Sequence, residues 1–267
     1  MPTPADAPRT PFMEERRRSI MEQLNDNESV LVSELAERFG VSPATVRSDI
    51  RALEAEGRLE RTHGGAIAIS PNHPTEMEID ARRTVNRRQK MRIGRRAAQL
   101  VEDGDFILVD SGTTTQAFVD ELVGRRALTI LTNDLRIASM AETTLRDANV
   151  IMIGGAVRTG FHTTQGADAI DMLRRYAAPR LFSCCDTLTL ERGFSTYTTE
   201  QAAIKRAMIE QAQQCIMLMD SSKWGLNAPV RCADITDVDI IVTDSGLPAE
   251  AAEAIQSVPG GPQLIVA

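Results

Sequence analysis

The sequence predicts an α/β protein with two domains: a small, mainly helical one at the N-terminus and a larger one built on a mostly parallel sheet. The 267 residues suit two domains better than one small one. Near the N-terminus, two short segments with apolar residues at helical spacing are joined by a glycine-containing turn. Beyond residue 92, short, uniformly apolar segments alternate with helical ones, which is typical of parallel strands covered on both faces.

Composition excludes several classes of protein. Aromatic residues make up 4% of the chain, which argues against stacking platforms for single-stranded nucleic acid. The net charge of −7 still allows a small DNA-reading module, because local charge decides such binding. The four cysteines and three histidines lack metal-ligand spacing, so we expect reduced, buried thiols and neither a metal nor a cofactor. The proline-rich start and the lack of an apolar run of about 20 residues indicate a cytoplasmic protein with no membrane segment.

Two helices that follow a first predicted helix (residues 12–24) define the N-terminal domain. Ser33 is the expected N-cap of the first of these two helices, and Gly40 ends it. Ser42 caps the next helix and places Pro43 at its first position, where a missing N–H costs nothing. Two short helices joined by a short turn with glycine are the signature of a helix-turn-helix.

The second of these two helices has a buried face and an exposed one. Val46, Ile50 and Leu53 recur at i, i+4 and i+7 and form the buried stripe. Arginine on the opposite face can pair with guanine or hold a phosphate, and serine and threonine hydroxyls can contact bases or backbone. The predicted DNA-binding residues of this helix are therefore Ser42, Thr45, Arg47, Ser48 and Arg51.

A small hairpin follows these helices. Residues 59–61 and 66–69 are strand-like and flank the turn THGG, where Arg61, His63 and Gly64 lie ready to contact DNA beside the helix. Residues 12–70 therefore read as a winged helix-turn-helix. The alternative is a packing or dimerisation module, because this segment carries more acids than bases.

A basic connector (residues 71–91) is expected to join the two domains, and residues 1–11 are expected to form a disordered arm. The turn-rich stretch SPNHP marks the boundary. Eight basic residues fall between positions 82 and 96, and a solvated helix face is the usual explanation of such a run. The alternatives are a further contact to DNA or an anionic ligand.

Residues 92–267 form the predicted effector domain, and the residues just past its strands are polar or glycine. Ligands gather beyond the C-terminal ends of parallel strands, and a glycine followed by hydroxyl-bearing residues at a helix start makes an anion site. A lysine at the same rim would supply a point charge for a phosphate. The candidate effector-binding residues are Asp110, Ser111, Gly112, Thr113, Thr114, Thr115, Asn133, Gly154, Gly155, Asp186, Lys205 and Lys223.

The segment VSPATVRSDIRALEAEGRLERTHGGA is similar to the signature of DeoR-type bacterial transcription regulators. DSGTTT, LTN, GGAVR, EQAAIKRAMI and DSSKWG resemble the sugar-sensing domain of the same family, so the match covers roughly residues 14 to 245. The resemblance implies a domain related to ribose-5-phosphate isomerase, glucosamine-6-phosphate deaminase and the CoA transferases, which senses phosphorylated sugars or their relatives. It also adds Arg158 to the candidate effector-binding residues.

The chain departs from the family pattern at two places. Ser48 stands where relatives usually have a second arginine, so the operator sequence cannot be inferred from them. Residues 184–187 read CCDT where relatives usually have GADG. Thr187 places a side chain where relatives have a glycine, so we expect an effector of unusual size or shape.

These observations predict a sequence-specific DNA-binding transcriptional regulator, a repressor of a carbohydrate-metabolism operon controlled by a phosphorylated sugar. The expected partners are double-stranded operator DNA, the effector and further copies of the chain, as a dimer or tetramer. We do not expect an enzyme. The alternative is a sugar-phosphate isomerase or deaminase with a DNA-binding module, in which a strand-end carboxylate such as Asp110 or Asp186 acts as general base. A third possibility is an assembly protein whose basic connector binds anionic surfaces.

Overall fold

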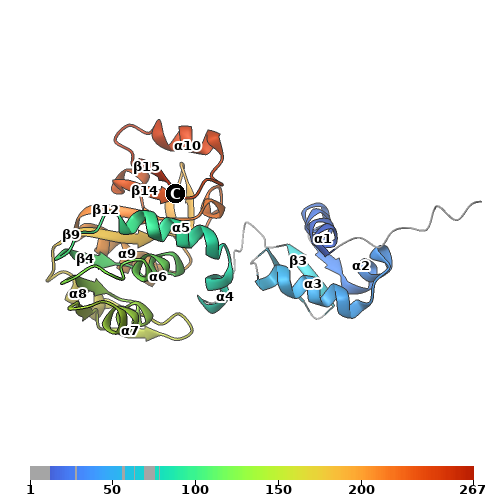
Figure 1. Ribbon diagram of the computed structural model, residues 1–267. Helices are drawn as coiled ribbons and strands as arrows, with labels where there is room; N and C mark the ends of the chain where they lie inside the picture. The colour runs from blue at the N-terminus through green and yellow to red at the C-terminus, as the bar shows by residue number, and fades with distance from the viewer. Residues whose placement is uncertain (1–12, 28, 56–57, 63, 69–75, 78) are drawn as a thin grey trace, which may run out of the picture. The chain divides into compact units, whose positions relative to one another are not determined.

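The computed structural model describes residues 13–27, 29–55, 58–62, 64–68, 76–77 and 79–267. The chain divides into two compact units, Met1–Val85 and Asn86–Ala267 (Figure 1). Among the described helices, none has the length and apolar character needed to cross a membrane.

The N-terminal unit is a winged helix-turn-helix. Its elements are α1 (Met13–Asn27), β1 (Ser29–Leu31), α2 (Val32–Phe39), α3 (Pro43–Ala55), β2 (Leu59–Arg61), β3 (Gly65–Ala68) and α4 (Ile79–Thr84). The strands form an antiparallel sheet in the order β1-β3-β2. The predicted stripe of Val46, Ile50 and Leu53 is confirmed, because each side chain is buried against α1 and α2 in one apolar cluster.

The start of α2 differs from the prediction. Ser33 is not the N-cap; Leu31 is, and within the described residues no side chain caps this helix. The reason is tertiary: β1 runs directly into α2, and the Val32 N–H donates to the Gly64 carbonyl at 2.9 Å. The backbone of the wing therefore satisfies a group that a side chain usually satisfies. Gly40 does end α2, as predicted, and it adopts the left-handed conformation.

The second unit is built around a seven-stranded sheet in which every neighbouring pair is parallel. Its strands, in spatial order, are β15 (Gln263–Val266), β14 (Ile240–Thr243), β12 (Ala212–Leu218), β9 (Ala178–Cys184), β4 (Phe106–Val109), β5 (Thr129–Thr132) and β6 (Asn149–Met152). The predicted mostly parallel α/β domain is thus confirmed.

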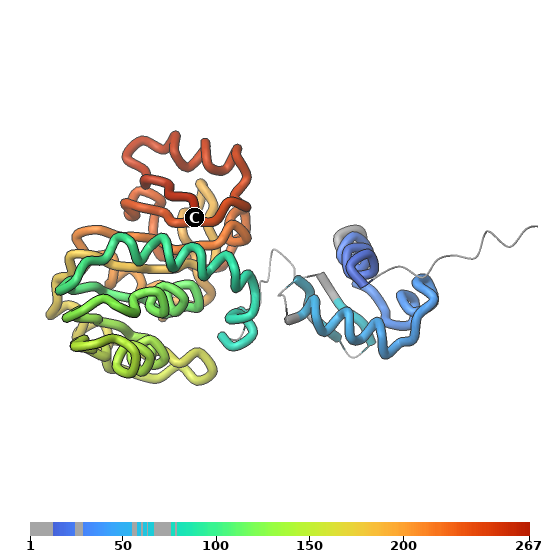
Figure 2. The backbone as a smooth tube through the Cα atoms, in the orientation of Figure 1, coloured from blue at the N-terminus to red at the C-terminus, as the bar shows by residue number. Residues whose placement is uncertain are grey.

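Helices cover both faces of this sheet (Figures 1 and 2). Alternate strand residues point to opposite faces, so Ile107 and Val109 belong to one buried cluster and Leu108 to the other. The first cluster also contains side chains from α5 (Arg87–Ala98), α6 (Thr113–Asp120) and α7 (Leu135–Thr144). The second contains side chains from α8 (Ala167–Leu173), α9 (Thr199–Glu210) and α10 (Ala249–Gln256).

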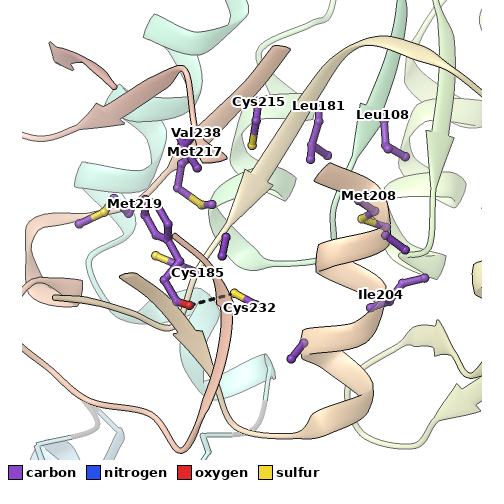
Figure 3. Close-up of a cluster of buried hydrophobic side chains, with 14 of the residues drawn as sticks. Leu108, Leu181, Cys185, Ile204, Met208, Cys215, Met217, Met219, Cys232 and Val238 are labelled. Atoms are coloured by element: carbon purple, nitrogen blue, oxygen red, sulfur yellow. Dashed lines mark hydrogen bonds between the residues drawn. The ribbon is translucent and has the colours of Figure 1, made fainter. Parts of the chain in front are cut away.

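Figure 3 shows part of the second cluster, to which Ile204 and Met208 of α9 belong. Three of the four cysteines, Cys185, Cys215 and Cys232, belong to it. All four are free and buried, as predicted. Burial raises the pKa of the Cys232 thiol to about 11, so this side chain packs as a small apolar group at neutral pH.

Two small antiparallel elements were not predicted. One is the hairpin of β7 (Ala156–Arg158) and β8 (Thr163–Gln165). The other is a sheet in the order β10-β11-β13, made of Thr187–Thr189, Gly193–Thr196 and Val230–Ala233. These strands have three or four residues, which is too short for a clear alternation of apolar and polar side chains.

The order of strands reverses between β4 and β9. From β4 the chain proceeds outward to β5 and β6, then returns to β9 on the other side of β4 and proceeds outward through β12, β14 and β15. In open parallel sheets, such a reversal leaves a crevice beyond the carboxyl ends of the two central strands. The loop that begins at Asp110 lies at this position.

Candidate functional site

The cap of α3 is confirmed, and it engages one of the predicted DNA-binding hydroxyls. The Ser42 Oγ accepts from the Thr45 N–H at 3.1 Å and lies 2.9 Å from the Thr45 Oγ1. Arg47, Ser48 and Arg51 are exposed on the same helix. The Arg51 Nε donates to the Arg47 carbonyl at 3.2 Å, which holds the two arginines side by side.

Asp49 holds α3 to α1. It is buried, and its carboxylate accepts from the Arg16 Nε at 2.7 Å, while the Arg17 Nε lies 3.5 Å away. This contact fixes how α3 is rotated and therefore which side chains it exposes. No local pattern in the sequence indicates this contact, because Arg16 and Asp49 are 33 positions apart.

The wing lies beside α3. A groove of about 410 Å³ is lined by Arg47 of α3, Arg61 of β2, Val32, Ile50, Thr62 and Gly65. Arg61 is exposed and lies 3.4 Å from Glu54. Gly64 is exposed at the turn, and His63 lies outside the described residues. The predicted arginines of the helix and of the wing therefore share one groove.

At the reversal of strand order, Asp110 and Lys205 form a buried ion pair. The Lys205 Nζ donates to the Asp110 Oδ2 at 2.5 Å and to the Cys184 carbonyl at 2.8 Å. Asp110 also accepts from the Ser183 Oγ at 2.7 Å and from the Ser111 N–H at 2.8 Å. Asp110 has no exposed surface and Lys205 is 6% exposed, so both charged groups are enclosed by surrounding side chains and backbone.

Charge keeps Lys205 protonated despite its burial. Burial is the largest single effect and lowers the pKa of this ammonium group, but the negative charge of Asp110 and smaller contributions from other groups nearby together outweigh it, so the pKa is raised above its ordinary value. Asp110 and Lys205 thus hold β4, β9 and α9 together beneath the predicted anion site. Ser183 and Cys184, which complete this arrangement, were missed because they lie 73 positions from the residues they contact.

The helix α6 starts just after this pair in the chain, and its N-cap is Gly112, two residues beyond Asp110. Within the described residues, no side chain caps its first turn, formed by Thr113, Thr114 and Thr115. The Thr115 hydroxyl instead donates to the Gly112 carbonyl at 2.8 Å. An uncapped helix start presents backbone N–H groups and the positive end of the helix dipole, which favour an anion.

Gly112 is fixed by close packing. A Cβ at this position would lie 2.3 Å from the Cys184 Sγ, far inside any van der Waals contact. The glycine therefore lets the loop between β4 and α6 lie directly against the end of β9.

Two buried polar atoms in the segments that follow β5 and β9 have no hydrogen-bond partner in the part of the chain that the structure describes. One is the Oδ1 of Asn133, whose Nδ2 donates to the Thr164 carbonyl at 3.1 Å. Asn133 follows β5, beside Asp110 on the neighbouring strand. The other is the Oγ1 of Thr187, the first residue of β10. Buried polar atoms are rarely left unpaired, because an unmade hydrogen bond costs about 1–3 kcal/mol.

The other predicted effector residues lie around this centre. Asp186 is buried and accepts from the Thr196 Oγ1 at 2.7 Å. Lys223 is half-buried in the turn η1 (Ser221–Lys223) after β12, and among the described residues no carboxylate lies within ion-pair distance of it. Gly154 and Gly155 are exposed after β6.

Arg158 lies on the hairpin of β7 and β8. Its guanidinium carbon stands 3.6 Å from the centre of the Phe161 ring, a cation–π contact within the hairpin. The structure therefore brings the residues of β4, β5, β9 and α9 together at the reversal, whereas Arg158 belongs to a separate projection at the same edge.

Matches to known proteins agree with this two-part architecture. Residues 16–72 match the model of the DeoR-like helix-turn-helix domain, and residues 85–245 match that of the DeoR C terminal sensor domain. The HTH-type transcriptional regulator YulB of Bacillus subtilis (strain 168) is 33% identical over 91% of this chain and 93% of the relative. The transcriptional repressor AccR of Agrobacterium fabrum is 33% identical over 87% of this chain and 90% of the relative.

Among solved structures, the fold is similar to ribose 5-phosphate isomerase A from Methanocaldococcus jannaschii. The TM-score is 0.39 and the identity is 16%, over 52% of this chain and 55% of that chain.

The winged helix and the α/β sensor together define a one-chain transcriptional regulator that carries its DNA-binding domain and its sensor domain in a single polypeptide. The chain belongs to the DeoR family, as the resemblance in its sequence predicted.

Proposed function

We propose that the protein is a transcriptional repressor whose winged helix binds operator DNA and whose sensor domain binds a phosphorylated sugar. The observation that carries the sensor part is the uncapped start of α6 at the reversal of strand order, next to the unpaired Oδ1 of Asn133. The name of the relative AccR, a transcriptional repressor, supports the direction of regulation.

The chemistry of the site favours a ligand with both a phosphate and hydroxyl groups. The phosphate would accept from the N–H groups of Thr113 and Thr114, and Lys223 would supply a positive charge that has no ion-pair partner among the described residues. Sugar hydroxyls would donate to the Asn133 Oδ1 and the Thr187 Oγ1, which have no protein donor in the described part of the chain. One ligand would thus satisfy an open helix end and two buried acceptors.

Binding of DNA is supported by the shared groove of the winged helix. Arg47 projects from the helix that enters the major groove in helix-turn-helix proteins, and Arg61 projects from the wing beside it. One guanidinium can therefore contact a base edge while the other contacts a phosphate. Because operators of such proteins repeat a half-site, we infer that the protein acts as a dimer or tetramer. We also infer that it acts in the cytoplasm, where the DNA is located.

The geometry favours a sensor over an isomerase or deaminase. A general base must reach a proton of the substrate, yet Asp110 is fully buried and accepts from Lys205, Ser183 and Ser111. Asp186 likewise accepts from Thr196. Incubation with ribose 5-phosphate and with glucosamine 6-phosphate should therefore give no product, and turnover of either one would contradict this assignment.

The DNA part is tested by replacing one arginine in each unit. An operator is first selected from random duplex DNA, and its affinity is then measured at fixed salt for the wild type, Arg47→Ala and Arg174→Ala. Arg174 is an exposed arginine of the sensor unit, so it controls for the loss of one charge. Loss of Arg47 should weaken binding by about 1–3 kcal/mol, roughly 5- to 150-fold, and relax sequence preference. Equal affinity of both variants would mean that α3 does not read the DNA.

The sensor part is tested by thermal unfolding with ribose 5-phosphate, glucosamine 6-phosphate and unphosphorylated ribose. A ligand that binds the folded protein raises its Tm with concentration. We expect at least one phosphorylated sugar to raise the Tm, ribose to have no effect, and Lys223→Gln to reduce the shift. A panel of sugar phosphates without any shift would remove the support for a phosphate site.

A further inference from the structure

The first residue of the sensor unit, Asn86, makes an unusual contact. It lies between α4 and α5 and adopts the left-handed conformation, with φ 52° and ψ 34°. Asparagine at a helix start usually caps that helix with its side chain. Here, within the described residues, the side chain makes no cap bond; its Nδ2 donates to the Asp220 Oδ1 at 2.9 Å and to the Ser222 Oγ at 3.1 Å.

Both acceptors belong to the turn that carries Lys223. Asp220 caps this turn, since its carboxylate accepts from the Ser222 N–H at 3.2 Å and from the Ser222 hydroxyl. The Asn86 side chain therefore joins the place where the connector enters the sensor unit to a turn 134 positions further along the chain.

Charge converges on Asp220. Burial is the largest single effect and raises the pKa of this carboxyl, but Lys223, Ser222, Lys90 and Asn86 together outweigh it, with Lys223 contributing most, so the pKa lies below its ordinary value. Asp220 is 1% exposed, and Lys90 is buried in the first turn of α5. The buried Asp220 carboxylate thus interacts on one side with Lys223 of the turn. On the other side it interacts with Lys90 and the Asn86 amide, which belong to the segment that begins the sensor unit.

The opposite side of the turn is anchored to the sheet. Asp244, which follows β14, accepts from the Ser221 N–H at 2.7 Å and from the Ser221 Oγ at 3.2 Å. Because β14 is a buried strand, this side of the turn is held rigidly. Asn86 instead is the second residue of the two-residue link between α4 and α5. A movement of the turn would therefore shift the backbone of this link.

We propose that Asn86 is a positioning residue that transmits occupancy of the effector site to the connector. When an anion binds Lys223, it competes with Asp220 for that lysine. Asp220 is then compensated less by the turn and holds Asn86 and Lys90 more tightly, which orders the start of α5. This inference rests on the proposed effector site, because it requires the anion to bind at Lys223.

Two substitutions at Asn86 separate the side chain from the backbone. Asn86→Gly keeps the left-handed conformation without strain and removes the amide. Asn86→Asp also tolerates this conformation but sets a carboxylate against Asp220. Asp147→Gly is a matched control, because Asp147 is an exposed, non-glycine residue of the sensor unit with φ 56°.

Hydrogen exchange of the full-length chain measures the effect, with inorganic phosphate as the probe and thermal unfolding as the measure of its binding. Phosphate should slow exchange of the amides of residues 86–92 about fivefold or more in the wild type and in Asp147→Gly, the lower end of a typical coupling. The effect should be absent in Asn86→Gly and Asn86→Asp, although phosphate still raises the Tm of both variants.

A double-mutant cycle of Lys223 and Asn86, measured without ligand, tests the same coupling. Lys223→Ala removes the competing lysine, as an anion would, so it should slow exchange of residues 86–92 by itself and should fail to do so when combined with Asn86→Gly. If phosphate binds but the Asn86 variants respond like the wild type, the coupling is wrong and the effector site stands. If phosphate does not bind but the cycle is non-additive, the coupling stands and the effector site is wrong.

Discussion

Replacing Lys205 by methionine tests whether the buried ion pair is framework or ligand-binding surface. The substitution keeps the length of the side chain and removes the charge, which leaves the Asp110 carboxylate buried without its cation. Breaking a buried pair in this way typically costs about 3–5 kcal/mol. Asp110 retains Ser183 and the Ser111 N–H as donors, so we expect a value near the lower limit, about 3 kcal/mol.

Thermal unfolding of the sensor unit measures this loss. For a domain of this size, 1 kcal/mol shifts the Tm by about 2–4 °C, so Lys205→Met should lower it by about 6–12 °C. Because the pKa of Lys205 is raised above its ordinary value, its stabilising charge is present throughout the range below about pH 10. The loss should therefore be similar at pH 7 and pH 9.

Two further variants make the prediction specific. Lys205→Met combined with Asp110→Asn removes both charges and should recover at least half of the lost Tm. Lys223→Met removes a half-buried lysine that compensates Asp220 without an ion pair among the described residues, so it should lower the Tm much less than Lys205→Met. The reasoning fails if Lys205→Met unfolds at the wild-type temperature and loses only its response to sugar phosphates, because Lys205 would then act as a ligand-binding residue.

Substitutions that begin at Gly112, Asp134 and Asp49 test separate parts of the structure. Gly112→Ala should lower the stability of the sensor unit by about 1–3 kcal/mol, since its Cβ would lie 2.3 Å from the Cys184 Sγ, and adding Cys184→Ala should relieve the clash in chemical denaturation. Asp134→Ala should cost about 1 kcal/mol, because Asp134 caps α7 through the Arg136 and Ile137 N–H groups. Asp134→Asn keeps the cap and removes a buried charge. Because burial raises the pKa of Asp134, the wild-type carboxyl becomes neutral as the pH falls toward that pKa, so any stability that the variant gains over the wild type at pH 7 should shrink. Asp49→Ala should cost about 3 kcal/mol and speed hydrogen exchange of α1, and unchanged exchange would mean that Arg16 does not hold α3 in place.

Local patterns in the sequence determined the class of both domains. The helix-turn-helix follows from one buried stripe, the helix-ending Gly40 and the Ser42 cap, each of which is recognised from a few neighbouring residues. The parallel sheet follows from short apolar strands alternating with helices, since a strand covered on both faces carries no polar alternation. These signals depend on helical and strand periodicity and need no knowledge of distant parts of the chain.

Which of the predicted residues contact one another depends on the arrangement of distant parts of the chain. The order of strands places β9 beside β4. This arrangement brings Asp110, which follows β4, within reach of Lys205, 95 positions further along the chain. The contacts of Asp49 with Arg16 and of Asn86 with Asp220 likewise join residues 33 and 134 positions apart. The physical reason is that a buried charge takes whichever partner the packing brings within reach, and packing is set by the whole chain and not by the residues on either side of the charge.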